Sequence, residues 1–464
     1  MKNWKKIRLI LALSLLTNAI CIAQQSFYFS LESPAQLFTG EMAILNNRDI
    51  FFVSCFSGDS INTCGYFGQI DNHGNQKYAS SIENHSLSSV LLIADEILLV
   101  GTSKNDSGEK EINIYKVVNN NEISIEATFP ITSHSNSASS PKAFLNSRNE
   151  IVIFYSTFYN IQILVVDTQM NVITQKIYSN FFTFFDLIEN PDKNSYTGLS
   201  LTDQYRFIVF DTNFEIINEY PGEYYFWLNN FKWINDSTLL NIGKTHDDYI
   251  GVETLDKNFN RLKSHEFGAI DTVNHPAFFK ALLWPDTGNS FYIFTTKGVS
   301  TFHTRPGWLG LAKFNKESLE PEWIRYFGGS DFYYQALSIE QYADDGILLQ
   351  ATRAYIYDEV RKEALVIIKT DTEGNFPLSI DNHPAEMQSQ FTVFPNPGQE
   401  LRIEASVEGA LLELYNLNGQ LLHTQSLGSG LNSINTDQLP PSTYIYRISL
   451  KNDLVGSGKW VKMK

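Results

Sequence analysis

The sequence has few cysteines, no catalytic signature and, after its first residues, no long apolar run. Only 3 of the 464 residues are Cys, which excludes a disulfide-dense scaffold or a cysteine-rich zinc domain. No nucleophile elbow, phosphate-binding loop or His-Glu-x-x-His motif occurs in it. No stretch beyond the N-terminus is apolar over the roughly 18–20 residues that a membrane span needs. We therefore expect no membrane span in the mature chain.

Basic residues are also scarce. Lys and Arg number 35 against 51 Asp and Glu, and the section between residues 24 and 390 carries most of the excess, with 25 basic and 45 acidic groups. Such a body repels phosphate backbones, so nucleic-acid binding is disfavoured, as is adhesion to anionic lipid. Hydrophobic residues make up 43% of the chain and aromatics 14%. This composition predicts a folded protein of two or three units.

The N-terminus has the pattern of a secretion signal. Four basic residues lie within the first eight, and Leu9 to Leu16 contains only apolar residues, Ala and Ser. Cys21 and Ala23 are small residues at the −3 and −1 positions of a cleavage site, so we predict a signal peptide over residues 1–23. The apolar run is too short for a transmembrane anchor. Ile20 stands where a lipoprotein signal normally has Gly, Ala or Ser, which argues against acylation of Cys21.

Removal of the signal leaves two cysteines, Cys55 and Cys64. An even pair in an exported chain favours a disulfide over metal or redox chemistry. The two residues flank a short loop between two predicted strands, and if these strands pair, the two Cβ atoms can meet across the hairpin. The sequence therefore predicts a Cys55–Cys64 disulfide that stabilises this hairpin locally. A reactive thiol pair is the alternative.

An apolar strand recurs seven times at intervals of about 43–56 residues. The copies lie at 49–54, 96–101, 150–155, 195–200, 237–243, 290–295 and 346–351. A short apolar strand and a turn rich in Asn and Asp precede each copy, and a third strand that often ends in Asp follows it. Four short strands per unit and a period near 45 residues are typical of a β-propeller, whereas a β-helix has a shorter period and a sandwich does not repeat.

The seventh repeat ends after its third strand, at Asp371. The mature N-terminus begins with a spare strand, residues 26–31, which is predicted to complete the last blade and to hide two sheet edges. The fold class that follows is all-β: a seven-bladed β-propeller over residues 24–380, then a linker at 381–390, then a small Ig-like β-sandwich over 391–464.

The seventh repeat also carries a family resemblance. Residues 323–331 run Trp-Ile-Arg-Tyr-Phe-Gly-Gly-Ser-Asp, and residues 366–375 run Val-Ile-Ile-Lys-Thr-Asp-Thr-Glu-Gly-Asn. This pattern resembles the repeats of secreted Bacteroidetes-type β-propellers, with Asp345 in place of a usual Gly. The other six repeats are degenerate, so the resemblance itself covers about 55 residues.

The C-terminal segment contains an ordered set of motifs. They are Phe394-Pro395-Asn396-Pro397, a turn from Tyr415 to Gly419-Gln420, a strand with Tyr444 and Arg447, and a tail ending Lys459-Trp-Val-Lys-Met-Lys464. The set resembles the C-terminal sorting domain of the type IX (Por) secretion system, although Phe394 replaces a Tyr and Ser442 replaces a Gly. An unrelated Ig-like domain is the alternative. The resemblance implies recognition by the type IX machinery, removal by proteolysis, and a protein that is secreted or held at the outer-membrane surface.

Ligands of propellers usually bind at the face formed by the second-to-third-strand loops and the loops between blades. Aromatic residues gather there in the sequence and suit stacking on sugar rings or a protein contact. Packing between blades is the alternative for each of them. The candidate ligand-binding residues on this face are Tyr224, Tyr225, Trp227, His303, Trp308, Tyr333 and Tyr334, together with the polar loop His246, Asp247 and Asp248.

His246, Asp247 and Asp248 form the best candidate for a polar cluster that could ligate a divalent ion or act in acid–base chemistry. No second set at diagnostic spacing accompanies it, so an ordinary polar loop is favoured. A calcium loop at Asp371–Asn375 is likewise less favoured than a capped turn. No cofactor, metal or catalytic residue is predicted.

Three functions fit these observations. The first is a non-catalytic exported propeller that binds a glycan or a surface protein. A polysaccharide-acting hydrolase or lyase on a propeller scaffold is the alternative, since sequence spacing says nothing about carboxylates that approach across a ring. A passive surface or adhesion component is the third. Converging carboxyl groups of raised pKa would favour the enzyme.

Overall fold

The computed structural model describes residues 26–375 and 391–462. Its internal gaps lie at 33–35, 58–62, 120–121, 132–139, 158–159, 181–182, 202–204, 223–226, 269–271, 300–304, 329–330, 343–345, 358–362, 395–398, 406, 417–419 and 451–452. The chain divides into two compact units, residues 1–377 and 378–464. The predicted signal peptide lies outside the described residues. No helix within the described ranges is long and apolar enough to cross a membrane.

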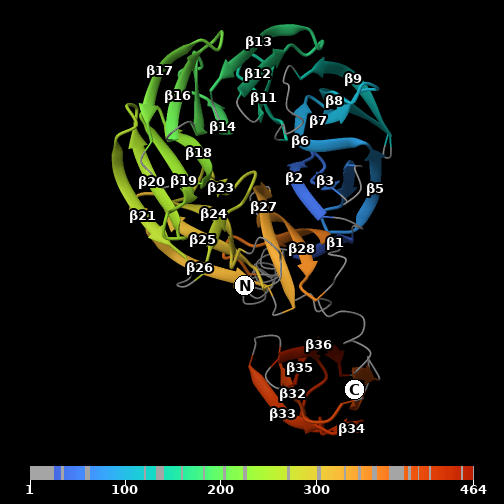
Figure 1. Ribbon diagram of the computed structural model, residues 1–464. Helices are drawn as coiled ribbons and strands as arrows, with labels where there is room; N and C mark the ends of the chain where they lie inside the picture. Colours follow the sequence, from blue (N-terminus) through green and yellow to red (C-terminus); the bar gives the residue numbers. More distant parts are fainter. Residues whose placement is uncertain are drawn as a thin grey trace, which may run out of the picture. The chain divides into compact units, whose positions relative to one another are not determined.

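Unit 1 is a succession of antiparallel sheets arranged in a ring (Figure 1). The first sheet holds β2 (Gln36–Ile44), β3 (Ile50–Ser57), β4 (Thr63–Ile70) and β5 (Gln76–Glu83), and the second holds β6 (His85–Ile93), β7 (Glu96–Lys104), β8 (Lys110–Asn119) and β9 (Glu122–Pro130). The third sheet holds β10 (Lys142–Leu145), β11 (Ile151–Thr157), β12 (Asn160–Val166) and β13 (Val172–Ser179). The fourth holds β14 (Thr183–Glu189), β15 (Ser195–Leu201), β16 (Tyr205–Asp211) and β17 (Ile216–Pro221).

Three further sheets follow in the described part of unit 1. The fifth sheet holds β18 (Trp227–Asn235), β19 (Thr238–Lys244), β20 (Ile250–Asp256) and β21 (Arg261–Phe267). The sixth holds β22 (Asn274–Pro276), β23 (Leu282–Leu283), β24 (Ser290–Lys297), β25 (Trp308–Asn315) and β26 (Pro321–Phe327). The last sheet holds β27 (Phe332–Tyr342), β28 (Gly346–Tyr355) and β29 (Glu363–Thr370), together with β1 (Phe27–Glu32).

The recurring apolar strand is the second strand of each sheet. Its copies coincide with β3, β7, β11, β15, β19, β24 and β28. These strands are buried over most of their length; β11, for example, is buried at every residue. A strand that is covered on both faces reads as a continuous apolar run rather than as an alternating pattern, which is why the repeat is visible in the sequence.

The N-terminal strand closes the ring as the sequence predicted. β1 pairs antiparallel with β29, from Phe27 opposite Lys369 to Glu32 opposite Ala364. The Phe29 ring also lies 5.7 Å from that of Phe52, in the first sheet. β1 thus belongs to the last sheet by hydrogen bonding and contacts the first sheet by packing, and Figure 1 shows it at the edge of the sheet that contains β27 and β28.

The core of unit 1 lies between neighbouring sheets. Seven clusters of buried side chains each join two adjacent sheets, and the seventh joins the last sheet to the first. Polar contacts reinforce that last junction, since Gln350 Nε2 donates to the Val53 carbonyl at 3.1 Å and the Tyr342 hydroxyl to the Arg48 carbonyl at 2.8 Å. Unit 1 is a closed β-propeller, and the seven described sheets agree with the seven copies of the repeat.

The predicted disulfide between Cys55 and Cys64 is wrong, because neither thiol forms a disulfide. β3 and β4 do pair, but Cys55 lies opposite Gly65 and Cys64 lies opposite Phe56. The two cysteines are therefore one residue out of register. Side chains alternate between the two faces of a strand, so those of Cys55 and Cys64 point to opposite faces of the sheet and cannot be bridged.

Both thiols should therefore be available once the protein is unfolded. Cys55 is buried, and burial raises the pKa of the Cys64 thiol, so both should react slowly in the folded protein. We expect alkylation in denaturant without reductant to modify both cysteines, as read by peptide mass spectrometry. A cross-linked peptide that contains Cys55 and Cys64 would contradict the register given above.

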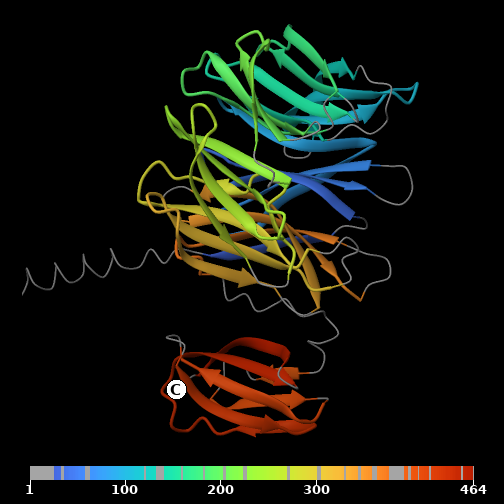
Figure 2. The same ribbon diagram turned by 60° about the vertical axis from the view of Figure 1, so that its left-hand side comes forward.

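Unit 2 is a two-sheet β-sandwich, whose layers can be followed in Figure 2. One sheet holds β30 (Phe391–Phe394), β31 (Leu401–Ala405) and β34 (Gly430–Ile434), and the other holds β33 (Leu421–Leu427), β32 (Ala410–Tyr415), β35 (Thr443–Leu450) and β36 (Asp453–Val461). Alternate residues of β31 and β32 point inward and join one core with Trp460, which is fully buried. This arrangement agrees with the Ig-like sandwich expected from the sequence.

Candidate functional site

A cavity of about 430 Å³ lies at the inner strands of unit 1. Successive sheets contribute a polar or charged residue to its wall: Glu41 from β2, Ser89 from β6, Lys142 from β10, Asp186 from β14, Lys232 from β18 and Lys280 from the segment between β22 and β23. We call these residues, together with the adjoining Glu340 of β27, the channel site. The sequence analysis missed this site.

The lining of the cavity extends along the inner strands toward the face opposite the one that the sequence predicted for ligands. Its lining includes Glu189 and Trp233, which lie at the ends of β14 and β18, beside the turns that lead to the second strands. The predicted ligand face is formed by the loops at the other ends of these strands. The channel site is therefore distinct from the aromatic residues selected from the sequence.

The lysines of the channel site are held by different partners. Lys280 Nζ lies 2.5 Å from Glu340 Oε1 and forms an ion pair with it. Lys142 Nζ donates to the carbonyl of Phe185 at 2.9 Å. Burial lowers the pKa of Lys232, and the nearby Lys280 adds to this effect. Among the described residues, no carboxylate lies within ion-pair distance of Lys142 or Lys232.

Burial favours the neutral form of two carboxyl groups of the channel site, those of Glu41 and Asp186. Glu41 Oε2 accepts a hydrogen bond from the Val90 amide at 2.8 Å. Burial nevertheless raises the pKa of Glu41 to about 7, and the nearby Glu340 contributes to this shift. Burial also raises the pKa of Asp186, with Lys142 acting against it. Burial therefore weakens the negative charge that Glu41 and Asp186 place opposite the lysines, and for Glu41 this effect is strongest below about pH 7.

Rigid backbone holds the cavity wall in place. The segment between β22 and β23 crosses to β27, where the Phe279 amide donates to the Leu337 carbonyl at 2.9 Å and the Ile339 amide to the Lys280 carbonyl at 3.0 Å. Asn230 Oδ1 accepts from the Ala281 amide at 2.5 Å. These hydrogen bonds fix the arrangement of the wall, which lowers the entropic cost of binding a ligand.

Aromatic rings complete the wall of the cavity. Phe144, Trp233 and Phe279 line it, and each is only partly buried. The indole of Trp233 is fixed in place, since its Nε1 donates to Asn190 Oδ1 at 2.8 Å. Rings beside charged and amide groups are the usual lining of a small-molecule site, and the volume falls within the usual range of such sites.

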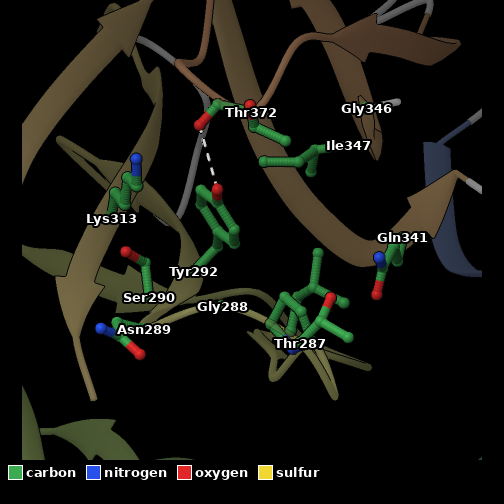
Figure 3. A pocket seen from close by; sticks show the side chains of 12 residues that line it. Thr287, Gly288, Asn289, Ser290, Tyr292, Lys313, Gln341, Gly346, Ile347 and Thr372 are labelled. Atoms are coloured by element: carbon green, nitrogen blue, oxygen red, sulfur yellow. Dashed lines mark hydrogen bonds between the residues drawn. The ribbon is translucent and has the colours of Figure 1, made fainter. Parts of the chain in front are cut away.

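A second cavity of about 250 Å³ lies between the last two sheets, on the side of the first-to-second-strand turns (Figure 3). The Tyr292 hydroxyl donates to the Thr372 carbonyl at 3.0 Å across it. Its lysine, Lys313, is already paired with Glu373 at 2.8 Å and with Glu322 at 3.4 Å. This cavity has less unpaired charge to offer a ligand than the channel site.

The aromatic residues predicted to bind ligand fall into three groups. Tyr224, Tyr225 and His303 lie outside the described residues, as does the side chain of Trp227. Trp308 starts β25 and is half-buried, with Gly328 against its ring. The structure does not bring these residues into one described site.

Tyr333 and Tyr334 are buried, at 1% and 5% exposure, so their selection as exposed stacking residues is corrected. The sequence analysis placed them before the first strand of the seventh repeat, but β27 begins at Phe332 and includes both. Both faces of a blade are covered by its neighbours, so consecutive residues of the strand are both buried. These two rings belong to the core.

The polar loop His246–Asp248 is an exposed turn. The side chains of His246 and Asp247 are 86% and 83% exposed, and Asp248 pairs with Lys244 at 2.6 Å. Across the described ranges, no group of three or more His, Cys, Asp or Glu residues could hold a metal ion. These contacts support an ordinary polar loop.

The Asp-containing turns after the third strands share one capping geometry. Asp371 Oδ1 accepts from the amides of Glu373 and Asn375 at 2.9 and 2.8 Å, and the turns at Asp71, Asp167, Asp211 and Asp256 repeat this pattern. Hydrogen bonds from the Asn171 side chain and backbone lower the pKa of Asp167. The Asp carboxylates are therefore used as caps, which supports the capped turn over a calcium loop.

The sorting motif of unit 2 separates into core and surface residues. Tyr444 is buried beside Trp460, and its hydroxyl donates to the Pro440 carbonyl at 2.5 Å. Tyr415 and Arg447 are more exposed, and Arg447 lies 3.8 Å from Glu413, its partner across β32 and β35. Pro395, Asn396, Pro397 and Gly419 lie outside the described residues.

The basic tail of unit 2 is tied to the sandwich. Lys462 Nζ donates to the carbonyls of Thr436 and Leu439 at 2.5 and 2.8 Å, and the Lys462 amide donates to the Ser442 carbonyl at 2.9 Å. At least one lysine of the tail therefore has a structural role.

The fold and these motifs define an exported β-propeller with a C-terminal sorting domain. Residues 392–463 match the family described as the secretion system C-terminal sorting domain. This match confirms the predicted resemblance and indicates export by the type IX system to the cell surface or the medium. No curated protein sequence matches the chain.

Solved structures of propeller type are similar to the chain at low sequence identity. Sqt1 from Chaetomium thermophilum is 12% identical, with a TM-score of 0.45 over 82% of this chain and 96% of that one. The AfRom2 CNH domain is 11% identical, with a TM-score of 0.42 over 74% of this chain and 99% of that one. NanB sialidase from Streptococcus pneumoniae is 10% identical, with a TM-score of 0.42 over 74% and 70%. No activity is transferred from these proteins.

Proposed function

We propose that this protein is a non-catalytic binding propeller, displayed at the cell surface or secreted, that recognises a glycan or a surface protein through its channel site. A signal peptide over residues 1–23 would take it to the periplasm, and unit 2 would direct the second step through the type IX machinery. The observation that carries the binding role is the cavity itself, which combines partly buried rings with charged groups from successive sheets.

The binding role can be tested with the exported protein on arrays of bacterial and host glycans, and with defined surface proteins by surface plasmon resonance. Phe279→Ala removes a partly buried ring from the channel site and should weaken retention of any bound partner by roughly tenfold. Trp308→Ala changes the face predicted from the sequence and serves as the matched control. Retention that depends on Trp308 and not on Phe279 would place the binding surface elsewhere.

A polysaccharide hydrolase or lyase is the second candidate, because Glu41 and Asp186 line one cavity and burial raises the pKa of both. A carboxylic acid that stays protonated near neutral pH can act as a general acid. Release of new reducing ends from a polysaccharide, abolished by Glu41→Gln and by Asp186→Asn, would establish this activity. Binding without release, with both variants retained on the array, would exclude it.

A further inference from the structure

Three lysines approach the cavity from different parts of the ring. Lys142 lies on β10, Lys232 on β18 and Lys280 on the segment that leads to β23. In the described part of the chain, only Lys280 has a carboxylate partner in the channel, namely Glu340. Among the described residues, Lys142 and Lys232 therefore have no carboxylate within ion-pair distance, although Asp186 acts on Lys142 and Glu340 acts on Lys232 from farther away. An amine in such a place favours an anionic ligand.

The carboxyl groups of the cavity do not cancel this charge. Burial raises the pKa of both Glu41 and Asp186. When these groups are protonated they are hydrogen-bond donors rather than negative charges. The amines of Lys142 and Lys232 then face less opposing negative charge, inside a protein whose formal net charge is −16.

The rest of the wall suits a ring that carries hydroxyl groups. Ser89 and Asn230 provide hydroxyl and amide groups, while Phe144, Trp233 and Phe279 provide partly exposed rings. Sugars present hydroxyl edges and apolar C–H faces, which match these two kinds of group. A volume of about 430 Å³ is near the lower end of small-molecule sites and limits the ligand to about one or two sugar rings.

We propose that the channel site binds a carboxylated sugar, such as a uronic acid at the end of a short acidic oligosaccharide, with its carboxylate between Lys142 and Lys232. The inference rests on the proposed glycan-binding function and names its ligand class. The sugar ring lies against the aromatic wall of Phe144, Trp233 and Phe279. No bond of the ligand is made or broken.

Calorimetric titration of the full exported protein with digalacturonate, and with the neutral galactose disaccharide, tests this ligand class. The acidic disaccharide should bind at least about tenfold more tightly than the neutral one. Lys142→Met and Lys232→Met keep the apolar stem and remove the charge, so each should reduce this preference by roughly fivefold or more. The control is Lys176→Met on β13, where Lys176 pairs with Glu215, away from the cavity; it should change nothing.

The pH dependence provides a second readout that a structural role of the lysines would not give. Glu41 is surrounded by the Val90 amide and Ser89 of β6, by Glu340 of β27 and by Lys280, with Lys142 and Asp186 on the other strands that line the cavity. As the pH falls through about 7, Glu41 loses its negative charge and the acidic disaccharide should bind more tightly, by roughly fivefold. Glu41→Gln should bind tightly at both ends of this range and should lose the dependence.

The outcomes separate this inference from the proposed function. Equal binding of the acidic and neutral disaccharides, or unchanged binding in both lysine variants, would overturn the carboxylated ligand while leaving a glycan-binding propeller. Binding of a sulfated disaccharide without binding of digalacturonate would overturn it as well. If the protein retained no glycan and no surface protein at all, the proposed function would fail first.

Discussion

A chain that lacks residues 27–32 should not form a stable propeller. β1 covers the whole of β29, which is buried at every residue from Glu363 to Thr370. Without β1 this strand becomes an open edge that is flat and mostly apolar, and such edges pair with other chains. We expect the deleted protein to aggregate or to be degraded rapidly, as read by size-exclusion chromatography and limited proteolysis.

Phe29→Ala tests the same closure without removing the strand. Phe29 is 7% exposed and packs against Phe52 of the first sheet, so its truncation should lower the free energy of unfolding by about 3–5 kcal/mol. Urea titration followed by circular dichroism measures the loss. The control is Ser30→Ala in the same strand: Ser30 Oγ is buried and has no hydrogen-bond partner among the described residues, so its removal should be neutral or slightly stabilising.

Equal stability of Phe29→Ala and Ser30→Ala would mean that the ring is not held closed by β1. A large loss in both would indicate that the strand tolerates no change, and that the Phe29–Phe52 contact is not the particular source of its stability. The expected difference between the two variants is what assigns the closure to packing across the first and last sheets.

The propeller was predictable because its defining strands are covered on both faces. The second strand of each repeat must be apolar throughout, so the seven copies remain visible after the repeats lost sequence identity. The closure was predictable for a related reason: the seventh repeat lacks a fourth strand and Ser26–Leu31 supplies a spare one. Both inferences use the number and order of strands and need no side-chain geometry.

The failed predictions depend on geometry that spacing does not determine. A single step of register excludes the disulfide. Cys55 lies opposite Gly65 instead of Cys64, so the two cysteine side chains are on opposite faces of the sheet. The sequence predicts that Tyr333 and Tyr334 precede the first strand of the seventh repeat, whereas β27 already begins at Phe332. Strand ends are the least certain part of any such prediction.

The channel site was missed because its residues are distant in sequence and meet only when the ring closes. One local signal was present: a single charged residue lies between apolar neighbours in the first strand of several repeats, as in Phe185-Asp186-Leu187, Phe231-Lys232-Trp233 and Phe279-Lys280-Ala281. Superposition of the repeats would place these charges at the inner edge of each blade. The raised pKa of Glu41 could not be read from the sequence, because it arises from burial in the closed ring.

Trp460→Ala should unfold unit 2 and prevent export. Trp460 is fully buried and packs with Tyr444 at 5.9 Å between ring centres, in the core that holds the two sheets together. Truncation of a buried Trp costs about 3–5 kcal/mol, which is a large part of the stability of a small domain. In a host with the type IX system, the variant should accumulate inside the cell, with a several-fold loss of protein at the surface and in the medium by quantitative immunoblot.

The matched control is Leu431→Ala on β34, where the side chain is 61% exposed and its removal should change neither folding nor export. Limited proteolysis should show unit 2 of the Trp460 variant cleaved while unit 1 stays resistant, because the two units form separate compact bodies. If the variant is cleaved in this way but is exported normally, the type IX machinery recognises a linear segment, such as the basic tail, rather than the folded domain. If export and folding fail together, the machinery recognises the folded sandwich. The buried Tyr444 then contributes to sorting by stabilising that fold, while the exposed Arg447 and the partly exposed Tyr415 are accessible for recognition.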